Sequence, residues 1–147
     1  MTEFRRILFC TDFSEQSEQA FEYACSMVTQ QQGQLYLMHI VPVNPYSHLE
    51  LNAFVPVEQL NQLQSDIRKN VEKAFRERYL SRCEALKTQA VVREGNAYEE
   101  IIRFAEIEKV DLIIMGTTHA MPMGGVVSKV VMHSRIPVLV IPVARKE

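Results

Sequence analysis

Five short apolar segments alternate with helical patterns along the chain, and this alternation restricts the fold more than any other feature of the sequence. The segments are residues 7–10 (ILFC), 34–43, 89–93, 111–116 (DLIIMG) and 137–143 (PVLVIPV). Unbroken apolar runs such as ILFC are typical of strands buried on both faces. Strands that alternate with helices form parallel sheets covered by helices on both sides. Because crossovers are right-handed, we predict an α/β fold, a three-layer flavodoxin-like or Rossmann-like sandwich with a five-stranded parallel sheet in the order 3-2-1-4-5.

The intervening segments predict four helices, at about residues 15–31, 57–80, 98–109 and 124–134. Ser14 is the expected N-cap of the first helix, and Gly33 is expected to end it. The second helix should lie on the surface, with its charged residues as a solvated face. Its apolar stripe consists of Leu60, Leu63, Ile67, Val71, Ala74 and Tyr79. Residues 44–56 hold two of the six prolines and predict a loop.

Length and composition indicate one globular domain over residues 1–147, with 47% hydrophobic and 23% charged residues. The formal net charge of -2 lacks the electrostatic pattern of generic nucleic-acid or anionic-membrane binding, so we expect neither partner. Cys10, Cys25 and Cys83 are an odd number without CxxC spacing, which favours free thiols in a reducing compartment. With no signal peptide pattern and no apolar run long enough to span a membrane, we expect a cytoplasmic protein.

In a sheet of this order, ligands bind at the carboxyl ends of the strands where the order reverses, here between the first and fourth strands. The segment 11–13 and residues 116–118 follow those strands, and the end of the second strand lies alongside. The pair Gly124 and Gly125 precedes the last helix, where backbone N–H groups and the helix dipole suit a phosphate or another anion. A glycine N-cap in a tight turn is the alternative interpretation of that pair.

Four segments, in order and with matching spacing, resemble the universal stress protein family over nearly the whole chain. They are ILFCTDFSEQSEQAFEYA, LYLMHIV, EGNAYEEIIRFAEIEKVDLIIMGT and GGVVSKVVMHSRIPVLVIP. The resemblance implies a five-stranded α/β fold, dimers, a role in the stress response and, in many members, ATP binding.

ATP-binding members of that family carry G-x2-G-x9-G-[ST] after the fourth strand, and this chain matches the pattern only in part. Gly116 fits the first glycine and Gly124 the third, but His119 stands at the second. Four residues instead of nine separate His119 from Gly124, and Gly125 replaces the Ser/Thr. The phosphate loop is thus shortened by five residues. Two ligands remain open: ATP, with Mg²⁺ possible beside it, and a smaller adenine ligand such as AMP, which needs less of the missing loop.

The remaining motif positions imply a pocket for an adenine nucleotide. The resemblance puts Asp12 near adenine and ribose, with Thr11 and Phe13 beside it, and Ile40 at a backbone contact to adenine. The other implied contacts are Met115, Gly116, Gly124, Gly125, Val126 and Val127. The alternative is a family member that has lost nucleotide binding and acts only through dimerisation and contacts with other proteins, which the sequence does not identify.

The sequence gives little support for enzymatic, metal-binding or redox chemistry. The chain has no GxSxG, HExxH, GxxxxGK[ST] or GxGxxG, so we expect no enzyme, with slow ATP hydrolysis assisted by Asp12 as the alternative. The four histidines, His39, His48, His119 and His133, have no i,i+4 partner, so we expect no metal site. Cys10 ends the first strand beside the expected site, where a small core residue is the favoured interpretation over a redox thiol.

The last strand is apolar, uncharged and expected at a sheet edge. Free backbone groups on such an edge invite pairing with another chain. Pro142 lacks an N–H group and therefore suits an edge position. We predict a homodimer through residues 137–143, from Pro137 to Val143, by antiparallel pairing of two such edges.

Overall fold

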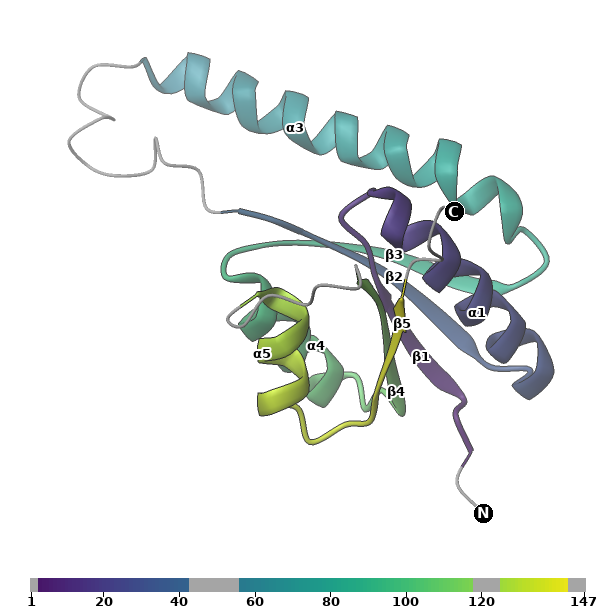
Figure 1. The fold of residues 1–147 in the computed structure, drawn as a ribbon. Coiled ribbons are helices and arrows are strands. Elements are labelled where there is room, and N and C mark those ends of the chain that lie inside the picture. The colour runs from purple at the N-terminus through teal and green to yellow at the C-terminus, as the bar shows by residue number, and fades with distance from the viewer. Residues whose placement is uncertain (1–2, 43–55, 118–124, 143–147) are drawn as a thin grey trace, which may run out of the picture.

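The computed structural model describes residues 3–42, 56–117 and 125–142. Five parallel strands form one sheet in the order β3-β2-β1-β4-β5, which confirms the predicted topology. The strands are β1 (Arg6–Cys10), β2 (Gln34–Val41), β3 (Lys87–Glu94), β4 (Leu112–Thr117) and β5 (Val138–Pro142). Figure 1 shows the twisted sheet between its helices.

Two helix layers cover the two faces of the sheet, as the alternation predicted. One face carries α1 (Glu15–Gln31) and α3 (Val57–Arg78), followed by the short 3-10 helix η2 (Leu80–Arg82). The other face carries α4 (Ala97–Ile107) and α5 (Val126–His133). Each face has its own buried cluster, because successive side chains of a strand point to opposite sides.

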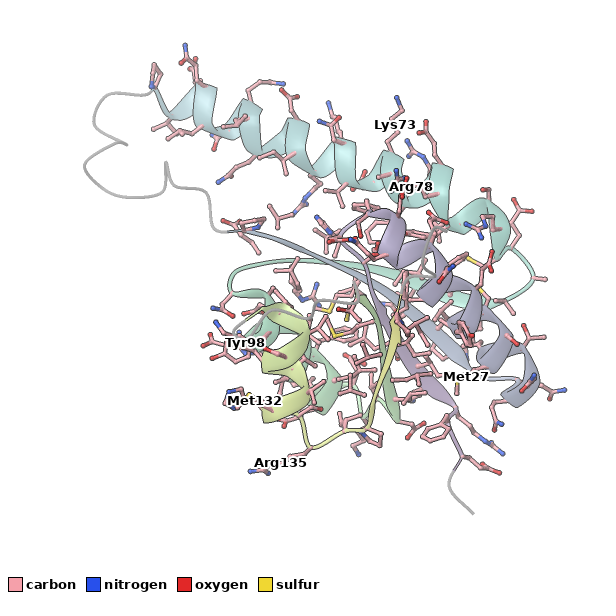
Figure 2. The ribbon with its side chains drawn as sticks, in the orientation of Figure 1. Met27, Lys73, Arg78, Tyr98, Met132 and Arg135 are labelled. Atoms are coloured by element: carbon pink, nitrogen blue, oxygen red, sulfur yellow. The ribbon has the colours of Figure 1, made fainter. Side chains whose placement is uncertain are left out.

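The helix α3 lies along the surface, and only its last turns reach the core (Figure 1). Val71 and Phe75 are its buried residues, and Tyr79 follows directly after it with no exposed surface. The predicted apolar stripe is therefore right in its second half and wrong in its first, where Leu63 is 39% exposed. Figure 2 shows Lys73 directed away from the sheet, as expected of the solvated face.

α1 ends at Gln31, as predicted, but the residue that ends it differs from the prediction. Gln32, not Gly33, adopts the left-handed conformation that ends the helix, with φ 51°. The N–H of Gly33 bonds the carbonyl of Val28, 3.1 Å away. Gly33 is needed for a different reason, because a Cβ there would lie 2.2 Å from the carbonyl oxygen of Arg5. Glycine is therefore required at position 33, because the chain there passes close to the backbone of Arg5, directly before β1.

Two smaller predictions also need correction. Ser14 is the N-cap residue of α1, but its side chain makes no capping hydrogen bond. β2 ends at Val41 rather than at residue 43. The predicted loop 44–56 lies outside the described residues except for Pro56, the N-cap of α3.

Candidate functional site

A small crevice lies where the strand order reverses, at the carboxyl ends of β1, β2 and β4. β1 pairs with β2 on one side and with β4 on the other, so the reversal falls at β1. The crevice opens on the face covered by α4 and α5, and it has a volume of about 160 Å³. Complete pockets for small molecules usually measure roughly 300–1,000 Å³, so the described residues bound space for a base or a ribose. Its walls include Cys10, Asp12, Ile40, Ala97, Ile101, Met115, Gly116, Val126 and Val127.

Asp12 stands at the rim of the crevice, directly before the turn into α1. Its Oδ1 accepts hydrogen bonds from the backbone N–H of Ser14 at 2.9 Å and from the hydroxyl of Ser17 at 3.0 Å. Partial burial acts to raise the pKa of this carboxyl, but the hydrogen bonds from Ser14 and Ser17 outweigh it and hold the pKa below its ordinary value. Asp12 is therefore ionised at neutral pH and can accept hydrogen bonds from ribose hydroxyls or an adenine amine. The same hydrogen bonds stabilise the fold above the unfolded pKa, and this stabilisation is lost as pH falls through the lowered folded value.

Gly116 brings the end of β4 against the first turn of α1. A Cβ at this position would lie 2.2 Å from the carbonyl oxygen of Gln16 and 3.2 Å from the backbone nitrogen of Ser17. Only a glycine allows this contact between two backbones. Ser17 also donates a hydrogen bond to the Asp12 carboxylate. The contact therefore places Gly116, at the floor of the crevice, close to Asp12 at its rim.

Most of the residues implied by the family motif meet at this crevice. Asp12, Ile40, Met115 and Gly116 line it, as do Thr11 and the residues Val126 and Val127 at the start of α5. Gly125 is the N-cap of α5, in an extended conformation, beside these two valines. Gly124 lies outside the described residues, with His119 and the rest of the shortened loop.

Phe13 is not among the lining residues, because its side chain lies on the other face of the sheet. Its ring packs against His39 and Phe75, with centroid separations of 4.7 Å and 5.2 Å. The backbone φ of Phe13 is 64°, in the left-handed region. The chain thus places Asp12 and Phe13, two neighbours, on opposite sides of the sheet.

The contributions of α4 and of Ser17 to the crevice were not predicted from the sequence. Ala97 and Ile101 form one wall of the crevice, and Ser17 is 4% exposed and bonds Asp12. A sequence signal for Ser17 did exist, since a serine in the first turn of a helix is well placed to bond an aspartate that precedes the helix. No comparable local signal points to α4. The position of this helix beside the crevice depends on how the connection from β3 to β4 packs on the sheet.

A larger groove of about 730 Å³ lies beneath α3, beside the ends of β2 and β3. Val41, Ile67 and Val71 contribute apolar surface, and Arg68 and Arg93 contribute charge. Pro42, also on this groove, is the last described residue before a gap. We assign the site to the smaller crevice because it lies at the reversal of strand order and carries a held carboxylate.

Cys10, His39 and His133 are held by burial, a hydrogen bond or ring packing. Cys10 is 9% exposed, and burial raises the pKa of its thiol far above the ordinary value, so it is a poor nucleophile. Nδ1 of His39 donates to the carbonyl of Thr11 at 2.8 Å, and the ring of His133 stacks on Tyr98 at 5.5 Å. Over residues 3–42, 56–117 and 125–142, no group of three or more His, Cys, Asp or Glu side chains is arranged to hold a metal ion.

None of the described helices combines the length and apolar character needed to cross a membrane.

The sheet order and the crevice at its reversal together define a doubly wound α/β protein with a crevice at the switch point, where ligands bind in such folds. The family model of the universal stress protein family matches residues 3–142, so the chain belongs to that family. This match confirms the resemblance found in the sequence.

A named relative agrees with this assignment, and a solved structure shows the same fold. The universal stress protein MJ0531 of Methanocaldococcus jannaschii is 28% identical over 98% of this chain and 85% of its own length. The structure of universal stress protein UspA from Lactobacillus plantarum aligns with a TM-score of 0.77 over 96% of this chain and 99% of its own, at 23% identity.

Two more distant structures of the family contain nucleotides. One is a universal stress protein in complex with cAMP, at 14% identity and a TM-score of 0.60 over 95% of this chain and 98% of its own. The other, from Archaeoglobus fulgidus, is in complex with dAMP, at 15% identity and a TM-score of 0.58 over 96% of this chain and 99% of its own. At these identities the likeness concerns the fold alone.

Proposed function

We propose that this chain is a cytoplasmic stress-response module, one domain over residues 1–147, that binds an adenine nucleotide and is not an enzyme. The observation that carries the proposal is the ionised Asp12 carboxylate at the rim of an apolar crevice at the switch point. Ile40 and Met115 offer apolar contacts for a base, and Asp12 offers an acceptor for its sugar or amine. Family members in complex with cAMP and dAMP make this ligand class a reasonable one.

The phosphate side of the proposed ligand would lie toward the start of α5. Val126 and Val127 line the crevice, so the first N–H groups and the positive dipole end of α5 are close to it. Because the loop is shortened by five residues relative to the family motif, we propose that AMP is bound at least as tightly as ATP. Mg²⁺ would accompany only the triphosphate.

We expect Asp12→Asn to weaken AMP binding about 10- to 100-fold, the usual effect of losing hydrogen bonds to a charged group. The amide retains an oxygen for Ser14 and Ser17, so the loop keeps its hydrogen bonds while the charge is removed. Calorimetric titration with AMP, ADP and ATP measures the affinity.

The matched control is Asp66→Asn, the same change on the exposed face of α3, which should leave the affinity unchanged. Absence of binding heat for all three nucleotides with the natural chain would refute nucleotide binding. The role through dimerisation and protein contacts alone would then be the better interpretation.

The homodimer is proposed from the free edge of β5. The carbonyl of Pro137 accepts a bond from the N–H of Ile113 at 2.9 Å, so the backbone groups of that residue face β4. Since this direction alternates along a strand, Val138 and Val140 turn their N–H and C=O groups to the free edge. Pro142 has the same orientation as Val138 and Val140. The N–H that it lacks would have pointed to the free edge, so no hydrogen bond to β4 is lost. This edge can pair with its copy in a second chain.

We expect Val140→Pro to convert the dimer to a monomer, because it removes an N–H from the free edge and leaves the bonds to β4 intact. Light scattering at micromolar concentration should then give 16.9 kDa instead of twice that mass. Val140→Thr keeps the N–H and the β-branched shape, so this control should remain dimeric. A Val140→Pro protein with the dimer mass would show that β5 is not the interface.

A further inference from the structure

Thr11, the residue between β1 and Asp12, has all its polar groups engaged. Its N–H donates to the carbonyl of Met38 at 2.9 Å, and its carbonyl accepts from Nδ1 of His39. Its hydroxyl oxygen accepts from the N–H of Phe13 at 2.9 Å and lies 2.7 Å from the hydroxyl of Tyr79. This last bond joins residues 68 positions apart, and both are buried, with Thr11 6% exposed and Tyr79 fully enclosed.

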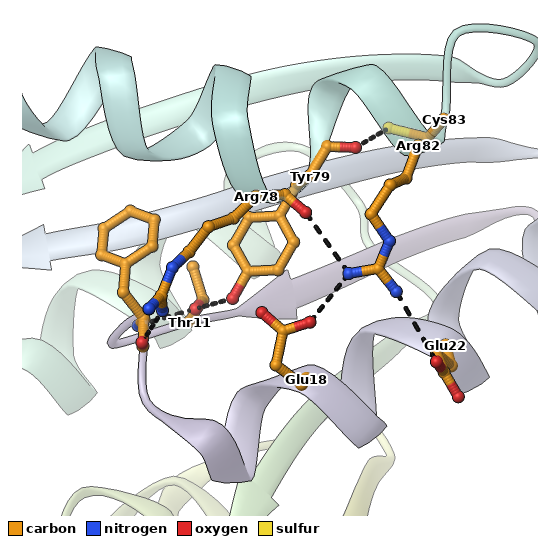
Figure 3. A network of polar contacts seen from close by, with 8 residues as sticks. Thr11, Glu18, Glu22, Arg78, Tyr79, Arg82 and Cys83 are labelled. Carbon is orange, nitrogen blue, oxygen red and sulfur yellow. Dashed lines mark hydrogen bonds and ion pairs between the residues drawn. The ribbon is translucent and has the colours of Figure 1, made fainter.

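Phe13 is held in its left-handed conformation from the α3 side of the sheet. The guanidinium of Arg78 donates to the carbonyl oxygen of Phe13, and the two aromatic rings of Phe13 and Tyr79 stack with centroids 6.0 Å apart. A bulky residue rarely adopts a positive φ unless its surroundings impose it. Residues 78 and 79 therefore hold both neighbours of Asp12. Figure 3 shows the hydroxyl of Tyr79 bonded to Thr11.

Tyr79 is itself fixed by its surroundings. Its N–H bonds the carbonyl of Phe75 at 3.0 Å, and its ring contacts Phe9 and Phe21 in the core. Three residues further on, Arg82 pairs with Glu18 of α1 at 2.7 Å and lies over the ring of Phe21. Arg82 thus ties the end of α3 to α1, and the contacts around Tyr79 hold its phenol group in place.

Resting on the proposed function, we propose that Tyr79 and Arg78 are positioning residues for the nucleotide site. They hold Thr11 and Phe13 from one face of the sheet and so fix where the Asp12 carboxylate stands on the other. A binding group must be held to within roughly half an ångström, and the residues that set its position then influence affinity without touching the ligand.

The variant Tyr79→Phe tests this proposal, because it keeps the ring in the core and removes only the hydroxyl. AMP affinity should fall about 3- to 10-fold, as expected for one net hydrogen bond. Tyr36→Phe removes a hydroxyl from a buried tyrosine on the opposite face of the sheet. It is the matched control and should leave the affinity unchanged. A drop of equal size in both variants would attribute the effect to general stability and overturn the proposal.

A second pair of variants separates positioning from packing. Thr11→Ser retains the hydroxyl, whereas Thr11→Val keeps the shape and lacks the hydroxyl, so Thr11→Val should bind AMP about 3- to 10-fold more weakly than Thr11→Ser. If Thr11→Val binds as well as Thr11→Ser, the hydroxyl pair does not position the site.

Amide hydrogen exchange gives a measurement that does not depend on nucleotide. In Tyr79→Phe, exchange at the amides of Phe13 and Ser14 should accelerate at least threefold, while the central amides of β1 keep their rates. If this occurs and the natural chain binds no nucleotide, the proposed function fails and the positioning of Asp12 stands. If the two amides are unaffected, the positioning proposal fails whatever the chain binds.

Discussion

Replacement of Gly116 by alanine is expected to lower the free energy of unfolding by about 3 kcal/mol, at the upper end of the usual cost of overpacking. The added Cβ would meet the carbonyl oxygen of Gln16 at 2.2 Å, and backbone cannot rotate aside as a side chain can. The start of α1 must therefore move away from β4. Chemical denaturation followed by far-UV circular dichroism measures the change.

Gly125→Ala is the control for this prediction. Gly125 has φ -71° and ψ 169°, which alanine adopts without strain. Glycine is preferred over alanine at an N-cap, but alanine also lowers the conformational entropy of the unfolded chain, which offsets part of that loss. We expect a loss of less than about 1 kcal/mol. Equal losses of stability in the two variants would show that the close approach of β4 to α1 is not the reason why residue 116 is a glycine.

The largest loss of stability is expected for Phe9→Ala, about 3–5 kcal/mol, the range measured for large-to-small changes of buried aromatic residues. Phe9 has no exposed surface and lies in the central strand. Its ring contacts Phe21 at 5.7 Å and Tyr79 at 5.5 Å between centroids, in a tilted and an edge arrangement. Removal of the ring leaves a cavity between α1, β1 and the end of α3.

Ile107→Ala is the comparison for Phe9→Ala, since Ile107 is 69% exposed and its truncation should cost no more than about 0.5 kcal/mol. Both proteins can be unfolded in urea under the same conditions, with the slope of the transition used to check that unfolding remains two-state. A loss below 1 kcal/mol for Phe9→Ala would mean that this face of the sheet repacks easily.

The architecture was predictable because its signals are local and periodic. Runs such as ILFC are too short and too apolar for anything but an interior strand, and their alternation with helices leaves few arrangements. The order of strands then fixes which ends meet, so the position of Asp12 near Gly116 followed from topology alone. The family resemblance added the ligand class, which the residues by themselves did not specify.

Features set by tertiary contact were not predictable in the same way. The choice of Gln32 for the left-handed position reverses the usual preference for glycine, because Gly33 is needed one residue later against Arg5. The role of Tyr79 was equally hidden. As one more apolar residue on a helical stripe, it gave no sign that its hydroxyl would reach Thr11.

The uneven burial of α3 has an evolutionary consequence. Only the second half of this helix, from Ile67 onward, packs against the core, and its end holds the loop around Asp12. Insertions, deletions and drift in the earlier turns can therefore accumulate at little cost to folding or to the crevice. Across the family, we expect the first half of this crossover to vary in length and the last two turns of its helix to vary little in length and sequence.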